Sequence, residues 1–231
     1  NAAAALLGGG AEGLERFAAR ARRAPEALAR FCTSLLLDRA PDSRSGALRI
    51  ATLSYSGSVL ACLRALAAVR AIAVPCSEGR PMLEGRRLAA ALAESGIPTL
   101  FYTDAALTAS LDGCEAVLVG ADAVAGDWFI NKVGTHAVVT MAAALGIPSY
   151  VVASREKFAP PWLADRLAPG DANPEEVWSD PPAGVLVRNL YFETVPLDPV
   201  AGVVSDIGIL PPARMPAACA ALAPADEVAT L

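Results

Sequence analysis

The stretch Ala-Val-Leu-Val-Gly-Ala-Asp-Ala-Val, residues 116–124, decides the fold class of this chain. An apolar run that ends in Gly-Ala-Asp is typical of a buried strand that carries a carboxylate, here Asp122, to the carboxyl edge of a sheet. Open α/β sheets bind their ligands at that edge. Asn131 and Lys132 follow a few residues later and bring an amide and a cation to the same neighbourhood. Acid, amide and ammonium together predict a site for a small anionic ligand.

Short apolar runs alternate with runs of helical periodicity on both sides of this stretch. Because strand and helix take turns, the pattern predicts right-handed βαβ crossovers and a parallel sheet. The expected strands are 48–53, 71–75, 99–102, 116–119 and 149–153, and the expected helices are 59–69, 83–94, 105–111 and 135–145.

The two ends of the chain differ from this middle part. Residues 12–37 have apolar residues at helical spacing and predict one or two helices with a break near Pro25. We therefore divide the chain into a short helical N-terminal segment, 1–45, and an α/β domain, 46–231. The later part predicts a long surface excursion at 159–184, late strands at 184–189 and 202–205, and a short helix with a loose end at 215–231.

Composition excludes several classes of protein. A net charge of −5 and a pI near 5.0 argue against a nucleic-acid groove, which requires clustered Lys and Arg. The sequence lacks the run of about 18 apolar residues that a transmembrane helix needs. Its opening residues lack the basic region of a signal peptide. We expect a cytoplasmic protein with a substantial core, since 54% of the residues are hydrophobic.

The cysteines and the single histidine predict no metal and no cofactor. An odd number of widely spaced cysteines without a Cys-x-x-Cys pair fits reduced, buried thiols. His136 alone cannot support a catalytic triad or a His-rich metal site, so we favour a structural role for it. The cysteines are Cys32, Cys62, Cys76, Cys114 and Cys219.

Two further loops at strand ends carry polar side chains. In the first, Ser56, Gly57 and Ser58 precede a helix, and they fit either an anion-binding turn or an ordinary serine cap. In the second, Arg80 is fixed by the following proline and suits bidentate recognition of phosphate or carboxylate. The alternative for Arg80 is a structural ion pair with Glu78 or Glu84.

Asp122 and Cys76 are the candidates for chemistry. Asp122 suits general acid or base work if burial raises its pKa, and the alternative is that it caps a turn or neutralises Lys132. The nearby Asn131 and Lys132 favour the functional interpretation. Cys76 is a candidate nucleophile, but without a histidine near it in the sequence we favour a buried thiol.

Six motifs follow one another along the chain. They are 52–59, Glu78-Gly79-Arg80-Pro81 with Glu84-Gly85, Gly120-Ala121-Asp122, Asn131-Lys132-Val133-Gly134-Thr135, Gly146-Ile147-Pro148 and Phe192-Glu193-Thr194-Val195-Pro196. In this order they resemble the superfamily of translation initiation factor 2B alpha, beta and delta subunits, which includes methylthioribose-1-phosphate isomerase and ribose-1,5-bisphosphate isomerase. The resemblance implies a Rossmann-like domain, a mostly parallel sheet with helices on both faces, that forms a homodimer.

The resemblance also implies roles for single residues. In the isomerases, a first-loop cysteine and the aspartate of Gly-Ala-Asp interconvert an aldose 1-phosphate and a ketose phosphate. Asp122 would then open the sugar ring, and Asn131 and Lys132 would contact ligand oxygens or phosphate. Together with the residues of the two loops described above, the full set of expected ligand-binding residues is Ser56, Gly57, Ser58, Glu78, Arg80, Glu84, Asn131 and Lys132.

The chain departs from the isomerases in three respects. Ser54 stands at the cysteine position, and a hydroxyl is a far poorer acid than a thiol. Glu84 replaces a glutamine, as in the initiation-factor subunits, and would repel a phosphate. The N-terminal helical segment is shorter than in the family and lacks an Arg-Gly-Ala loop.

These departures leave two main hypotheses. The first is a protein that binds a small phosphorylated ligand, a sugar phosphate or a nucleotide, with impaired or altered catalysis. The alternative is an aldose–ketose isomerase that uses Asp122, with Cys76 or a water in place of the thiol. Participation in translation initiation is disfavoured, because the Ala-, Arg- and Gly-rich composition is typical of bacteria, which lack that exchange factor.

Overall fold

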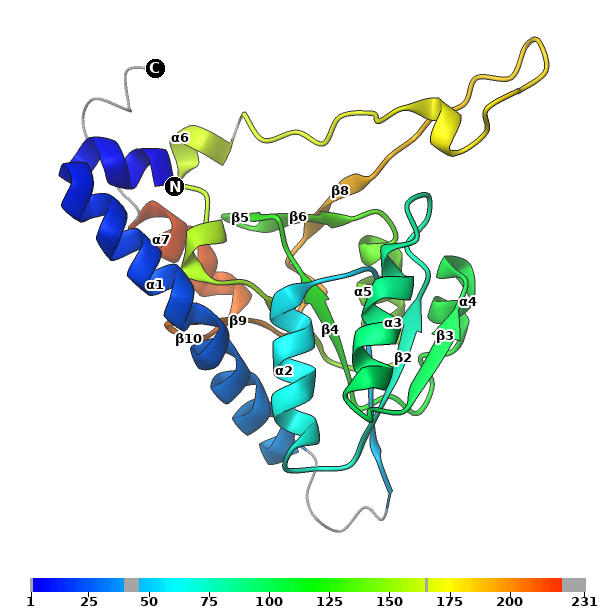
Figure 1. Ribbon diagram of the computed structural model, residues 1–231, viewed down its shortest axis with the longest axis horizontal. Coiled ribbons are helices and arrows are strands. Elements are labelled where there is room, and N and C mark those ends of the chain that lie inside the picture. Colours follow the sequence, from blue (N-terminus) through cyan, green and yellow to red (C-terminus); the bar gives the residue numbers. More distant parts are fainter. Residues whose placement is uncertain (1, 40–45, 165, 222–231) are drawn as a thin grey trace.

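The structure, a computed structural model, describes residues 2–39, 46–164 and 166–221, and within them a seven-stranded sheet forms the centre of the molecule (Figure 1). The strand order is β10-β9-β7-β4-β1-β2-β3, and all neighbours pair in parallel except β10 with β9. The strands are β1 (Leu48–Ala51), β2 (Ile72–Ser77), β3 (Thr99–Tyr102), β4 (Ala116–Gly120), β7 (Ser149–Val152), β9 (Gly202–Ser205) and β10 (Gly208–Leu210).

Helices cover both faces of this sheet, as predicted. Side chains alternate along each strand, so Val117 and Val119 of β4 enter one core while Ala116 and Leu118 enter the other. The first core is closed by α4 (Asp104–Ala109), α5 (Thr135–Ala144) and α7 (Met215–Ala220), and the second by α1 (Ala2–Arg39), α2 (Gly57–Ala67) and α3 (Glu84–Glu94). The predicted strands and helices between 48 and 153 are all present, with ends displaced by less than one helical turn.

Helix α1 differs from the prediction. The expected break near Pro25 is wrong, because the helix continues through this proline, and its non-helical point is Gly10, with φ 54° and ψ −143°. A proline inside a helix costs about 3 kcal/mol. Burial of Leu28, Cys32 and Leu36 against the second core offsets that cost, since each such side chain contributes about 1.5–3 kcal/mol.

A second, antiparallel sheet lies at the carboxyl end of β4 and was not predicted. It consists of β5 (Ala123–Ala125), β6 (Trp128–Lys132) and β8 (Phe192–Pro196), in the order β5-β6-β8. The predicted strand 184–189 is wrong: those residues form no strand, and β8 begins only at Phe192. Val185 and Leu186 are exposed and have no strand beside them to complete a ladder.

The predicted surface excursion is a long arm that leaves the body of the molecule and returns as β8 (Figure 1, yellow to orange). We define the arm as residues 166–190. Its only regular piece is a short 3₁₀ helix, and apolar side chains such as Trp178 and Leu186 are exposed on it. The remaining short elements are η1 (Arg155–Lys157), α6 (Pro161–Ala164), η2 (Pro174–Glu176) and η3 (Pro212–Arg214).

The C-terminal helix and the five cysteines agree with the prediction where the structure describes them. The late helix is present as α7, while the predicted loose end at 222–231 lies outside the described residues. All five cysteines are buried and free, as expected. None of the described helices combines the length and the apolar content that crossing a membrane would require.

Candidate functional site

The strand order creates a crevice between β1 and β4. From β1 the chain adds β2 and β3 on one side, and from β4 it adds β7 and β9 on the other, so the loops after β1 and β4 diverge. Ligands of open α/β folds bind at such a switch point. A pocket of about 870 Å³ lies there, lined by residues 53–58 after β1 and 120–122 after β4.

Most of the predicted site residues line this pocket. Arg80 and Glu78 do not. Arg80 is exposed, and its backbone N–H donates to Asp104 Oδ2 at 2.7 Å. Whether these residues bind a ligand stays a prediction. The predicted residues that line the pocket are Ser54, Ser56, Gly57, Ser58, Glu84, Asp122, Asn131 and Lys132.

The loop after β1 is strained and closely packed. Ser54 and Leu83 are the non-glycine residues with positive φ in the described part of the chain, both at 60°, and both line the pocket. Such backbone strain gathers at functional sites. Ser56 caps α2, because its Oγ accepts from the N–H of Val59 at 3.4 Å. A Cβ at Gly120 would lie 2.8 Å from that Oγ, so any side chain at the end of β4 would displace Ser56.

An ion pair closes the pocket on the side of α3 and β6. Lys132 is 3% exposed, and its Nζ lies 2.9 Å from Glu84 Oε1 and 4.8 Å from the centre of the Tyr191 ring. Glu84 Oε2 is buried without a hydrogen-bond partner. Lys132 is therefore neutralised by Glu84, and neither the predicted Glu84–Arg80 pair nor an Asp122–Lys132 pair forms.

Glycine at position 85 places Glu84 in the pocket. Gly85 N–H donates to the carbonyl of Glu78 at 2.9 Å, and a Cβ at this position would lie 1.7 Å from the carbonyl oxygen of Ser77. The first turn of α3 thus rests directly on the end of β2. No other residue allows this close approach of two backbones.

Asn131 is held by a short chain of hydrogen bonds. Its Nδ2 donates to Thr135 Oγ1 at 2.9 Å, and Thr135 Oγ1 donates to the carbonyl of Lys132 at 2.5 Å. Asn131 and Thr135 are both buried. The amide oxygen of Asn131 is left on the side of Gly120, toward the pocket.

Asp122 has a perturbed acidity. Its side chain is open to the pocket, yet the surrounding protein removes part of its water, and this desolvation raises the pKa of its carboxyl above the ordinary value. The ammonium of Lys157 opposes the shift, and Lys157 Nζ donates to the neighbouring Ala121 carbonyl. A carboxyl with a raised pKa in a pocket suits general acid catalysis.

Comparison with known proteins identifies the family. The sequence pattern of the Initiation factor 2 subunit family matches residues 10–212. The chain belongs to this family. The predicted resemblance to the initiation factor 2B superfamily is thereby confirmed.

Two sequence relatives within this superfamily are isomerases. The chain is 30% identical over 145 residues to ribose 1,5-bisphosphate isomerase of Methanocaldococcus jannaschii, which covers 61% of this chain and 47% of the relative. It is 37% identical over 179 residues to methylthioribose-1-phosphate isomerase of Nitratidesulfovibrio vulgaris, and the matched region covers 70% of this chain and 49% of that relative. The chain therefore spans about half the length of the curated relatives it matches.

A solved structure of the family supports the fold. Translation initiation factor eIF-2B of Pyrococcus horikoshii OT3 superimposes with a TM-score of 0.75 at 27% identity, over 88% of this chain and 70% of that one. The parallel sheet and its flanking helices are thus the arrangement of this initiation-factor family.

The thiol that the resemblance implies for the isomerases has no substitute in the pocket. Ser54, which the resemblance assigns to that position, lines the pocket, and none of the five described cysteines does. Cys76 lies on β2, fully buried in the second core, where burial raises its pKa to about 12, and it does not line the pocket. The hypothesis that Cys76 replaces the missing thiol is therefore wrong. His136 is exposed outside the pocket, and its backbone N–H donates to Glu193 Oε1 at 2.8 Å.

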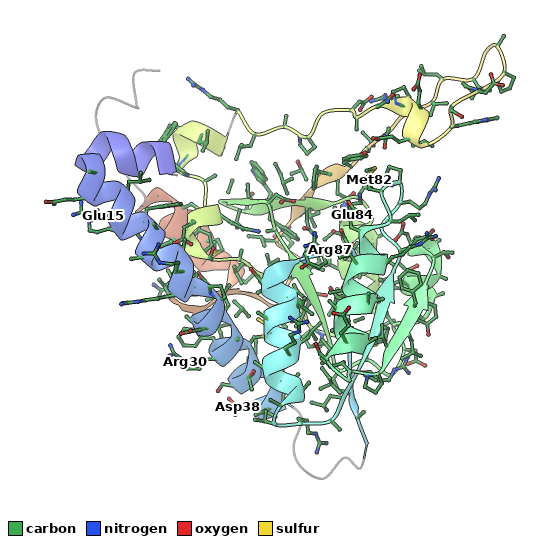
Figure 2. The ribbon with its side chains drawn as sticks, in the orientation of Figure 1. Glu15, Arg30, Asp38, Met82, Glu84 and Arg87 are labelled. Atoms are coloured by element: carbon green, nitrogen blue, oxygen red, sulfur yellow. The ribbon has the colours of Figure 1, made fainter. Side chains whose placement is uncertain are left out.

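Several residues that line the pocket are not predicted from the sequence. Arg87 lies on α3 one turn after Glu84, and this spacing is the signal that would have found it. Figure 2 shows Met82, Glu84 and Arg87 together at the end of α3 that is nearest to the small sheet. The other missed residues are Pro25, Leu53, Tyr55, Leu83, Lys157 and Phe192.

Proposed function

We propose that this member of the Initiation factor 2 subunit family binds a sugar phosphate or a nucleotide in the pocket between β1 and β4, with impaired or altered isomerase chemistry. One observation carries the proposal: Asp122, with its raised pKa, lines the same pocket as the Lys132–Glu84 pair. The position that the resemblance assigns to Ser54, where the isomerases have a thiol, supports impaired chemistry.

Ligand binding is supported by the composition of the pocket walls. Serine hydroxyls, the amide of Asn131 and the cations Lys157 and Arg87 can all contact oxygens of a polar ligand. Leu53 and Phe192 supply apolar surface for the face of a sugar or base. The names of the two isomerase relatives point to ribose phosphates as the class of ligand to test first.

Impaired catalysis is supported by the acid–base groups. Conversion of an aldose 1-phosphate to a ketose phosphate moves the hydrogen of C2 to C1, while the ring oxygen gains a proton and the C2 hydroxyl loses one. The site must therefore hold an acid for the ring oxygen and a base for the C2 side. Asp122 can perform one of these steps. The hydroxyl of Ser54 stays protonated at neutral pH and is a poor partner for the other, and Cys76 is out of reach.

The alternative function is that of an active aldose-1-phosphate isomerase. The raised pKa of Asp122 favours it, because a carboxyl that holds its proton more tightly than a free aspartate is better suited to donate to the ring oxygen as the ring opens. Turnover then requires a water as the second acid–base group.

Calorimetry tests the binding proposal. The panel is ribose 1-phosphate, ribose 1,5-bisphosphate, methylthioribose 1-phosphate and AMP. We expect at least one of them to bind, and Asn131→Asp to weaken that binding by at least about tenfold, because it adds a carboxylate beside the ligand. Asn173→Asp, on the arm, is the matched control. Absence of binding across the panel, or equal binding by the two variants, would refute the site.

Product analysis separates the two functions. We expect no ketose phosphate, or formation far below the usual 1–10³ per second of enzymes, from any aldose 1-phosphate in the panel. Turnover within that usual range would establish the isomerase. Ser54→Cys then sharpens the result, because a thiol at this position is expected to raise residual turnover.

The proposal includes a homodimer and a cytoplasmic location. Apolar side chains exposed on the arm support the former, because monomers seldom expose such groups together. Five free cysteines fit the latter. Sedimentation is expected to give twice the mass of the chain, and Trp178→Ser with Leu186→Ser to give a monomer. A monomeric wild type would contradict the dimer.

A further inference from the structure

The charges of the pocket leave one cation without a carboxylate partner. Among the residues that line it, the carboxylates are Glu84 and Asp122, and the cations are Arg87, Lys132 and Lys157. Lys132 is paired with Glu84, while Lys157 donates to the Ala121 carbonyl and its charge counteracts the rise in the pKa of Asp122. Arg87 has no carboxylate partner among the described residues, so the excess positive charge of the pocket resides on its guanidinium.

Arg87 is held in place by an aromatic ring from the opposite wall. Its guanidinium carbon lies 4.2 Å from the centre of the Tyr55 ring, and Tyr55 belongs to the loop after β1. A stacked guanidinium loses freedom to rotate but keeps the N–H groups at its edge available. Arg87 therefore reaches from α3 toward the loop that carries Ser54 and Ser56, with donors of fixed orientation.

Lys132 is a poor anchor for a phosphate in this chain. If it turned to a phosphate it would leave Glu84, whose other carboxylate oxygen is buried and already lacks a hydrogen-bond partner. Breaking a buried pair in this way leaves an uncompensated charge, which is strongly unfavourable. If Lys132 kept Glu84, the phosphate would have to approach a carboxylate. Both arrangements disfavour a phosphate there.

We propose that Arg87 binds the phosphate group of the ligand, and that the neutral Lys132–Glu84 pair and Asn131 face its hydroxyl groups. This inference rests on the proposed function, since it assigns the two ends of a phosphorylated ligand within the same pocket. The ligand then lies with its anionic end between α3 and the loop after β1, and with its polar, uncharged end toward β6.

The test compares Arg87→Gln with Arg86→Gln. Arg86 precedes Arg87 on α3, is exposed and does not line the pocket, so it controls for the loss of one positive charge. Calorimetry with ribose 1-phosphate and with inorganic phosphate is expected to show about 10- to 100-fold weaker binding of both probes to Arg87→Gln, and a change below about twofold for Arg86→Gln. Arg87→Lys is expected to give an intermediate loss, because it keeps the charge without the planar fork.

A third variant distinguishes the two ends of the ligand. Glu84→Gln removes a carboxylate beside Lys132 while keeping its size, so it would strengthen binding of inorganic phosphate if the phosphate sat there. We expect the dissociation constant of inorganic phosphate to change by less than about twofold in this variant. Thermal unfolding of each variant confirms that it folds.

The possible failures differ from one another. If the wild type binds ribose 1-phosphate and Arg87→Gln binds it equally well, the inference about Arg87 is wrong and the proposed function stands. Tighter phosphate binding by Glu84→Gln would likewise move the phosphate to Lys132 and overturn the inference alone. If the wild type binds neither probe nor any other member of the panel, both the proposed function and this inference are wrong.

Discussion

The pocket is built from two regions that differ in their exposure to solvent and in the pairing of their charges. We call the loops after β1 and β4, with Ser54, Ser56 and Asp122, the switch-point wall, and we call Glu84, Asn131 and Lys132 the buried cluster. The wall is open, holds a residue in a strained conformation and carries a carboxyl, Asp122, whose pKa is raised by desolvation against the opposing charge of Lys157. The cluster is mostly buried and pairs its charges within itself. Groups that can react are therefore on the wall, while the cluster contributes shape and stability.

Lys132→Ala is the largest expected perturbation of the cluster. It leaves Glu84 partly buried without its cation, and loss of one partner of a buried pair costs about 3 kcal/mol or more. Urea unfolding measures the change. Lys132→Met combined with Glu84→Leu removes both charges and is expected to recover most of the stability. If the single variant is as stable as the wild type, the pair is not a structural element.

Gly85→Ala is expected to disturb the cluster by changing the distance between the backbones of α3 and β2. Its Cβ would lie 1.7 Å from the Ser77 carbonyl oxygen, so α3 must move away from β2, at a cost of about 2–3 kcal/mol by the usual range for overpacking. Gly57→Ala is the control, because a Cβ there meets no atom within 4 Å and alanine favours the helix. Equal stability of the two variants would show that α3 does not depend on this contact.

The switch-point wall could be predicted from the sequence, whereas the pairing within the buried cluster could not. The wall rests on local signals: the apolar run before Gly-Ala-Asp, and the serines before the helix at 57–67, give both loops and their place at a sheet edge. The cluster depends on an ion pair between residues 48 positions apart, and no local sequence pattern predicts that Lys132 pairs with Glu84. Arg80, favoured because a proline follows it, does not line the pocket, whereas Arg87, one helical turn after Glu84, does.

Errors in the fold have the same origin. The local pattern predicts a late strand at 184–189, but a strand requires a partner, and it is 192–196 that lies beside β6. At Pro25 the local preference for a break was overridden by tertiary packing of the buried residues that follow it. In both cases the deciding interaction is distant in sequence.

Ser54→Gly tests the strain in the switch-point wall. Glycine adopts a φ of 60° without the penalty of about 1–2 kcal/mol that a side chain incurs, and it also raises the entropy of the unfolded chain. The net expectation is a gain of about 0.5 kcal/mol in urea unfolding. Ser58→Gly, inside the first turn of α2, is expected to lower stability instead. Losses of similar size in both variants would mean that the wall is not strained.

Asp122→Asn gives the smallest expected effect, and its sign depends on pH. Because desolvation raises the pKa of Asp122 in the folded protein, the folded state holds its proton to higher pH than the unfolded chain does. The contribution of this carboxyl to the free energy of unfolding is therefore fully present below its pKa in the unfolded chain. It is lost as the pH rises from that pKa to the raised pKa of the folded protein. The asparagine lacks this loss, so the difference in melting temperature between variant and wild type is expected to grow with pH and then level off. Asp180→Asn, an exposed acid on the arm, controls for a charge change far from the pocket. A melting-temperature difference for Asp122→Asn that shrinks with rising pH would reverse the assigned shift, and with it the argument that the reactive group of this pocket lies on the open wall rather than in the paired cluster.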